Sequence, residues 1–153
     1  AGWAERLVLL RNDRRVPRRQ VEQAATLARD FASDAATDGT LLHTDLHYEN
    51  VLAGDREPWL AIDPKPLVGD AAFEVAPLLR NRWDEAISSG DLGANLRWRA
   101  DVVAEHAGFD RGRVAGWVVV RQAVEALDAV VDGDAAGRDM SVAIAEALLR
   151  RLA

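Results

Sequence analysis

Two short apolar runs on either side of a loop constrain this chain more than any other feature. Residues 51–53 (Val-Leu-Ala) and 59–62 (Trp-Leu-Ala-Ile) are each long enough for one short strand, and residues 54–58 (Gly-Asp-Arg-Glu-Pro) are typical of a loop. The pattern predicts a small β-hairpin. Because a hairpin pairs the start of one strand with the end of the next, Asn50 and Asp63 should lie near each other.

The polar residues around this hairpin have the spacing of a kinase catalytic loop. His43-Thr44-Asp45 is followed by four residues and then Asn50, which gives H-x-D-x-x-x-x-N. Phosphoryl transfer needs a carboxylate to accept the proton of the acceptor hydroxyl, and oxygen ligands that hold Mg²⁺ against the phosphates. Asp45 has the position of the base, and Asn50 and Asp63 have the positions of the metal ligands.

The same segment allows other interpretations. Asp45 taken alone would more often be a turn or cap residue, and the catalytic interpretation depends on the complete motif. His43, Asp45 and His47 alternate along an extended segment, so they could also face one way as zinc ligands. That interpretation lacks further ligands, because the only other histidine is His106, in an expected helix. Lys65 is either exposed to solvent or close enough to Asp63 to touch a phosphate.

Length and composition predict one domain over residues 1–153, with 49% hydrophobic and 29% charged residues. No apolar run could span a bilayer, and the first residues do not have the pattern of a signal peptide, so we expect a cytoplasmic protein. The formal charge of −6 argues against nucleic-acid binding, which depends on neutralising phosphates with Lys and Arg. The chain contains no cysteine, which excludes disulfides and thiolate metal sites.

Apolar residues at helical spacing predict a mainly helical α+β fold around the hairpin. A short strand is expected over residues 40–43, and a loop or a short turn of helix over 84–93. Asp70 is well placed to cap the helix that follows it, and Pro77 should kink or divide that helix. The expected helices cover residues 3–11, 17–33, 71–82, 94–107, 111–131 and 141–152.

Two segments in order, HTDLHYENVL and AIDPKPLVGDAAFEVAPLL, resemble the C-terminal lobe of the aminoglycoside phosphotransferase family, which has a protein-kinase-like fold. Within that family the chain is most similar to the streptomycin and hydroxyurea phosphotransferases, whose metal-binding segment also reads I-D-P-K-P-x-x-G-D. The similarity extends from about Thr40 to Leu79, and more weakly from Asp110 to Gln122. Glu74 departs mildly from the family, which often has an aspartate in this region.

The resemblance implies a role for each matching residue. Asp45 is the catalytic base, and His43 braces the catalytic loop. Asn50 and Asp63 bind Mg²⁺ and thereby the nucleotide. Lys65 is added to these cofactor-binding residues because of its position after Asp63, and not as a match to the lysine that the family has before the catalytic loop. Gly69-Asp70 matches the segment whose aspartate hydrogen-bonds back to the catalytic loop. A pocket for a cationic, hydroxyl-rich substrate could be lined by Glu74, Trp83, Asp84, Glu85, Trp98, Glu105 and Trp117.

The resemblance also identifies what is absent before Asp45. This chain has no Gly-rich loop and no strand-borne lysine there. The N-terminal kinase lobe, which covers ATP, is thus expected to be absent from this chain and to be the partner that it needs. We therefore expect the catalytic lobe of an ATP- and Mg²⁺-dependent O-phosphotransferase acting on a small-molecule hydroxyl, such as that of streptomycin or hydroxyurea. Alone it should catalyse poorly. The alternative is a non-catalytic binding module. The face that normally meets the missing lobe would leave an exposed apolar patch, through which the chain could form a homo-oligomer.

Overall fold

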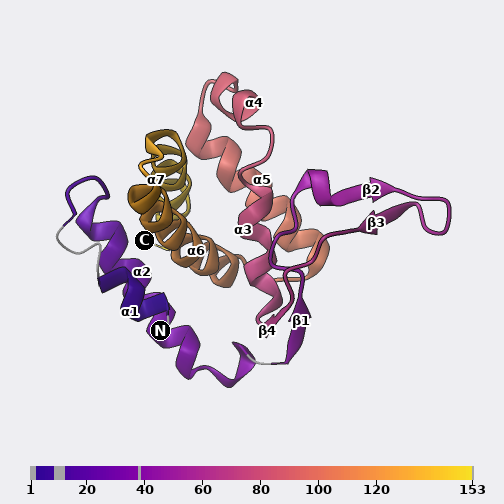
Figure 1. Ribbon diagram of the computed structural model, residues 1–153, viewed down its shortest axis with the longest axis horizontal. Helices are drawn as coiled ribbons and strands as arrows, with labels where there is room; N and C mark the ends of the chain where they lie inside the picture. The colour runs from indigo at the N-terminus through magenta and orange to yellow at the C-terminus, as the bar shows by residue number, and fades with distance from the viewer. Residues whose placement is uncertain (1–2, 9–12, 38, 153) are drawn as a thin grey trace.

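The computed structural model describes residues 3–8, 13–37 and 39–152, and these are mainly helical (Figure 1). The helices are α1 (Trp3–Val8), α2 (Arg18–Ser33), α3 (Val75–Leu78), α4 (Trp83–Ser88), α5 (Leu92–Ala107), α6 (Arg111–Asp132) and α7 (Ala135–Leu149). Short 3₁₀ turns form η1 (Ala35–Thr37), η2 (Tyr48–Asn50) and η3 (Ala71–Glu74). The strands are β1 (Thr40–Leu42), β2 (Val51–Ala53), β3 (Trp59–Ala61) and β4 (Leu67–Gly69).

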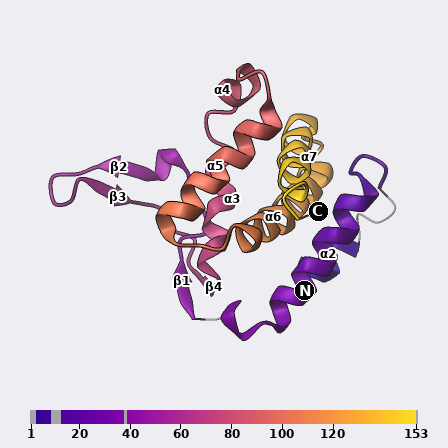
Figure 2. The same cartoon turned by 180° about the vertical axis from the view of Figure 1, so that it is seen from behind.

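Helix α6 is the centre of the packing. It contacts α1, α2, α3, α5 and α7, and Figures 1 and 2 show α7 beside it in both views. A helix covered on most sides is apolar around most of its circumference, and α6 buries Val114, Ala115, Gly116, Trp117, Val118, Val119, Val120, Gln122, Ala123, Val124, Ala126, Leu127 and Ala129. Most of the buried apolar residues of the described elements form one cluster, from Leu7 of α1 to Leu149 of α7.

The strands form two antiparallel pairs. β2 pairs with β3 in the register Val51↔Ala61, and the backbone N–H of Ile62 donates to the carbonyl of Asn50 at 2.9 Å. This confirms the predicted hairpin, and Asp63 is one residue beyond the pairing. Figures 1 and 2 show the hairpin projecting away from the helices.

The second pair was not expected. Residues 67–69 form β4, which pairs with β1 in the register Leu42↔Leu67, although the sequence pattern predicted no strand there. Pro64 and Pro66 precede the strand and therefore remove no hydrogen bond from it. Leu67 and Val68 are both exposed, so the strand has no alternating pattern that sequence reasoning could detect.

The helix expected over residues 71–82 is divided, as Pro77 suggested. It begins as η3, with the Asp70 carboxylate accepting from the N–H of Ala72 at 3.0 Å, and it continues as α3. Pro77 lies in the first turn of α3, where its missing N–H needs no partner. The turn expected within residues 84–93 is α4.

Helix α7 begins at Ala135, six residues before the predicted start at Ser141. The Asp134 carboxylate accepts from the N–H of Gly137 at 2.9 Å, so a cap rather than the apolar period starts this helix. The predicted end of the first helix, residues 9–11, lies outside the described residues.

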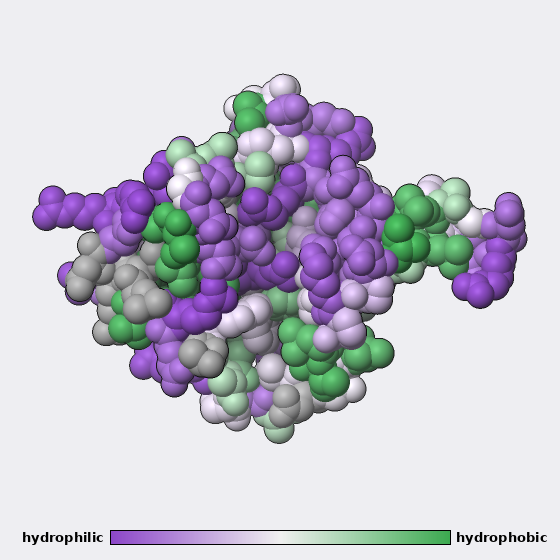
Figure 3. Space-filling view, viewed as in Figure 1, coloured by the Kyte–Doolittle hydropathy of each residue, from purple (hydrophilic) through white to green (hydrophobic). Residues whose placement is uncertain are grey.

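Exposed apolar side chains lie over both strand pairs, as Figure 3 shows. They include Leu41, Leu67 and Val68 on β1 and β4, and Leu52 and Trp59 on the hairpin. In the described part of the chain, the helices are too short or too polar to cross a bilayer.

Candidate active site

Thr44 lies in a strained conformation at the centre of the loop between β1 and η2. Its φ angle is 62°, which is rare for a β-branched residue. The Glu74 carboxylate accepts from its N–H at 2.9 Å, and the Arg121 guanidinium donates to its carbonyl at 2.7 Å. The Thr44 hydroxyl also donates to the carbonyl of Lys65. Strain of this kind persists only where the surroundings hold it, and it is concentrated at functional sites.

His43 joins the loop to the end of the hairpin. Its Nε2 lies 2.8 Å from the carbonyl of Ile62, an acceptor, so Nε2 carries the proton. Its Nδ1 is then free to accept from the N–H of Asp45 at 3.4 Å. The carbonyl of His43 accepts from the N–H of Lys65 at 2.9 Å. With both ring nitrogens engaged, His43 is positioned as a brace for the loop.

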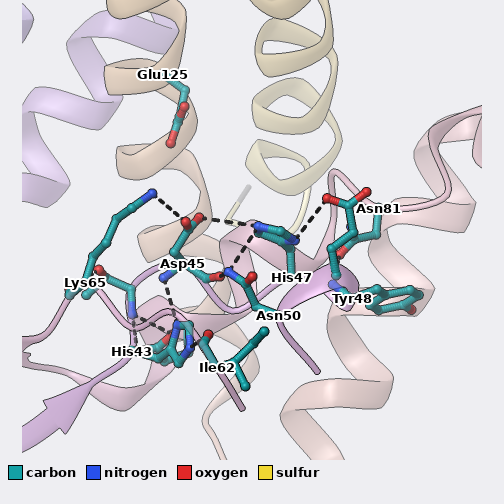
Figure 4. A network of polar contacts seen from close by, with 12 residues as sticks. His43, Asp45, His47, Tyr48, Asn50, Ile62, Lys65, Asn81 and Glu125 are labelled. Atoms are coloured by element: carbon teal, nitrogen blue, oxygen red, sulfur yellow. Dashed lines mark hydrogen bonds and ion pairs between the residues drawn. The ribbon is translucent and has the colours of Figure 1, made fainter. Parts of the chain in front are cut away.

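Asp45 is partly buried and forms an ion pair with Lys65, as Figure 4 shows. Lys65 Nζ donates to Asp45 Oδ2 at 2.6 Å. This hydrogen bond lowers the pKa of Asp45 and raises the pKa of Lys65. The Lys65 side chain is nevertheless 68% exposed. Lys65 is therefore exposed, as one of the two sequence interpretations expected, and its contact with the candidate base was not predicted.

Asn50 lies beneath Asp45 and is 7% exposed. Its Nδ2 donates to the carbonyl of Asp45 at 2.9 Å and lies 3.2 Å from His47 Nε2 (Figure 4). The described contacts use the amide nitrogen as a donor, which leaves Oδ1 as a candidate oxygen ligand. Asp63 follows β3 in a left-handed conformation, with a φ angle of 54°. One amide oxygen and one carboxylate suit Mg²⁺, which completes its coordination with water and phosphates.

The zinc interpretation does not agree with this geometry. His43 directs one ring nitrogen to a carbonyl and the other to an N–H, so neither is available to a metal. Among the residues that the structure describes, no three His, Cys, Asp or Glu side chains are grouped closely enough to hold a metal ion.

Gly69 supports the loop through the backbone. It pairs with Thr40 in the β1–β4 ladder, two residues before β1 ends at Leu42. A Cβ at Gly69 would lie 3.1 Å from Leu42 Cδ1, which leaves little room for a larger residue.

Asp70 contacts elements other than the catalytic loop, in contrast to the hydrogen bond that the resemblance implied. One carboxylate oxygen accepts from the N–H of Ala72, and the other from Arg113 Nε and from Trp117 Nε1 at 2.6 Å. Asp70 therefore ties η3 to α6. The side chain that reaches the loop from this segment is Glu74.

A cavity of about 230 Å³ opens beside Asp45. Asp45 and Lys65 line it together with residues of α1 and α6, and none of the pocket residues suggested by the sequence does so. Its lining carries both acids and cations. α6 contributes Arg121, Glu125 and Asp128, and α1 contributes Arg6 and the ring of Trp3. In Figure 4 the Glu125 side chain extends from α6 towards Lys65 and Asp45.

A family model described as aminoglycoside/hydroxyurea antibiotic resistance kinase matches residues 1–133. The chain belongs to this family. It is 48% identical over 108 residues to a streptomycin 6-kinase of Streptomyces glaucescens. These residues make up 71% of this chain and 35% of the relative. It is 47% identical over 122 residues to a hydroxyurea phosphotransferase of Kitasatospora aureofaciens, 79% of this chain and 34% of the relative. The chain thus spans about a third of the length of these relatives. No solved structure matches it.

In this member of the kinase family, sequence reasoning missed the residues that support the loop from a distance. Glu74 and Arg121 hold Thr44, yet they follow it by 30 and 77 residues. One signal was present for each. Glu74 stands in the segment that carried the resemblance, and Arg121 interrupts the apolar face of α6.

Proposed function

We propose that this chain is the C-terminal lobe of a protein-kinase-like fold, and that it carries the base and the metal ligands of an O-phosphotransferase. The observation that carries the proposal is the position of Asp45. Its carboxylate lines an open cavity, and its carbonyl is fixed from below by buried Asn50. A carboxylate held in this way can accept a proton from a hydroxyl bound in the cavity.

Membership of a kinase family supports ATP as the phosphoryl donor. Asn50 and Asp63 would hold Mg²⁺, which neutralises charge on the phosphates when it is bound. Lys65, exposed beside Asp45, is placed to contact a phosphate oxygen as a compact positive charge. His43, Glu74 and the β1–β4 pair then keep the base in place, since transfer of this kind depends mainly on positioning and charge stabilisation.

The acceptor is a hydroxyl of a small molecule. The names of the relatives suggest two compounds, streptomycin and hydroxyurea. The remaining length of the relatives supports a second lobe that covers the nucleotide as a partner. Exposed apolar side chains on β1 and β4, such as Leu41 and Val68, provide a surface for such a contact.

The experiment measures ATP consumption with Mg²⁺ and streptomycin, other aminoglycosides or hydroxyurea. Two proteins are compared, the chain alone and the chain extended by the coding sequence upstream of Ala1. We expect turnover in the extended protein, lost on Asp45→Asn and on Asp63→Asn. Asp55→Asn, a change to an exposed acid in the hairpin loop, is the matched control and should retain activity.

Near-normal turnover in Asp45→Asn or Asp63→Asn would contradict the assigned roles. Absence of turnover in a folded, extended protein with every acceptor would favour the alternative, a kinase-like binding module that transfers nothing.

A further inference from the structure

Each acid in the cavity beside Asp45 is already neutralised by a cation. Asp45 pairs with Lys65, and Glu125 pairs with Arg121 at 3.1 Å. The third pair joins Asp128 of α6 to Arg6 of α1. The formal charges of these six side chains cancel, so a cationic ligand gains a free carboxylate only by displacing one of the resident cations.

Arg121 is not available for displacement. It donates to the carbonyl of Thr44 at 2.7 Å and to Glu125, and its guanidinium lies 4.8 Å from the centre of the Phe73 ring. Its side chain is only 17% exposed. Removing it would release the strained backbone of Thr44 as well as an ion pair.

Arg6 is held much more weakly. In the described contacts, its guanidinium binds only Asp128, and the two side chains are 35% and 50% exposed. Exposed ion pairs contribute little to stability, because water screens the charges and the long side chain loses conformational freedom. A second guanidinium can replace the first on the same carboxylate without any change in hydrogen-bond geometry.

We propose that Asp128 is the binding site for a guanidinium group of the acceptor, and that Arg6 occupies this site as an internal competitor until the acceptor displaces it. The proposal rests on the proposed function, since it assumes that the acceptor binds in the cavity beside Asp45. Two features of the cavity favour a ligand that carries both a cation and a ring. Trp3 and Phe73 offer aromatic rings at the cavity wall, with centroids 5.2 Å apart. Asp128 offers its carboxylate on the same face of α6 as Glu125.

The test is binding without ATP, measured by isothermal titration calorimetry on the full chain. The two probes are streptomycin, which carries guanidinium groups, and hydroxyurea, which is neutral. We expect Arg6→Gln to tighten streptomycin binding about threefold, the order of one exposed ion pair. Asp128→Asn should weaken it about tenfold and should cancel the gain in the double variant. Neither change should alter hydroxyurea binding.

Two further variants control for general effects. Arg18→Gln removes an exposed arginine that pairs with Glu22 on α2, away from the cavity, and should leave both affinities unchanged. Arg6→Lys keeps the charge but loses the planar fork, so its gain should be smaller than that of Arg6→Gln. Thermal unfolding of each variant verifies that it is folded.

An equal affinity of the wild type and Arg6→Gln for streptomycin would overturn the proposal. So would a gain of the same size for hydroxyurea, or no measurable streptomycin binding by any folded variant. Turnover that depends on Asp45 but not on Arg6 would leave the proposed function intact and remove this inference. The expected binding pattern without any turnover would support this inference and contradict the proposed function.

Discussion

At the scale of single residues, the site depends on a backbone conformation that its own residue disfavours. Thr44 has a positive φ angle, and the side chains that hold it come from η3 and α6. Its neighbours His43 and Asp45 brace one another locally. Asp45, the candidate base, is therefore placed by contacts to both backbone groups of the residue that precedes it.

Replacing Glu74 with Ala should loosen this loop. The N–H of Thr44 would lose its acceptor, and we expect a cost of about 1–3 kcal/mol in the free energy of unfolding. Hydrogen exchange should show a loss of protection at the Thr44 amide, and urea denaturation should give the change in stability. Glu57→Ala, an exposed acid in the hairpin loop, is the control. Unchanged protection at Thr44 would show that Glu74 does not hold the loop.

Replacing Lys65 with Met should raise the pKa of Asp45. The Lys65 hydrogen bond favours the carboxylate, so it holds this pKa below its usual range. The contribution of this pair to stability is therefore present at neutral pH and is lost as the pH falls through the lowered pKa of Asp45. Titration of the Asp45 carboxyl by ¹³C NMR measures the shift, with Arg56→Met as control. A pKa that is the same in Lys65→Met and the wild type would contradict the ion pair.

At the scale of elements, aspartates start many of the regular segments. Asp91, Asp110 and Asp134 cap α5, α6 and α7 with their side chains, and Asp70 caps η3. Asp70 differs from the others because its carboxylate also binds Arg113 and Trp117 of α6. Arg113 in turn binds Asp34 at 2.7 Å, at the end of α2. One carboxylate thus links the start of η3 to α6 and, through Arg113, to α2.

A comparison of two caps tests this difference. Asp91→Ala removes an ordinary cap and should cost about 1 kcal/mol in the free energy of unfolding. Asp70→Ala also leaves a partly buried arginine and an indole N–H with fewer partners, and should cost about 3 kcal/mol. Thermal and urea unfolding of both variants give the two values. Equal costs would mean that Asp70 acts only as a cap.

At the scale of the whole molecule, α6 and the hairpin have opposite environments. α6 is buried among other helices, whereas the hairpin projects into solvent in both views of the structure (Figures 1 and 2). Its strands are three residues each, and an isolated pair of such strands has little stability of its own. Asn50 and Asp63 flank this pair, so the two candidate metal ligands stand where a stable region meets a labile one.

Native-state hydrogen exchange should reveal this contrast. Amides of β2 and β3 should open locally and exchange at least about 100-fold faster than amides in the middle of α6, which open only on global unfolding. Leu148→Ala, a change in the core of α7, should accelerate exchange in α6 but not in the hairpin. Equal protection of the hairpin and α6 would show that the hairpin is stabilised by contacts beyond its own ladder.

The local features were predictable from the sequence. Spacing alone indicated the hairpin at residues 51–62, the divided helix at Pro77 and the loop from His43 to Asn50, because each depends on residues close together in the chain. The start of α7 was misplaced, because its cap at Asp134 precedes the apolar period by several residues.

The contacts that complete the site were decided by the tertiary structure. Glu74 and Arg121 reach Thr44, Lys65 reaches Asp45, and α1 meets α6 at Asp128 only because the helices pack around α6. These pairs are separated by 20 to 122 residues. Residue type and local spacing are enough to identify the side chains that could do the chemistry, so these could be chosen from the sequence. Packing decided which of them meet, because a long-range contact depends on how every intervening element is placed.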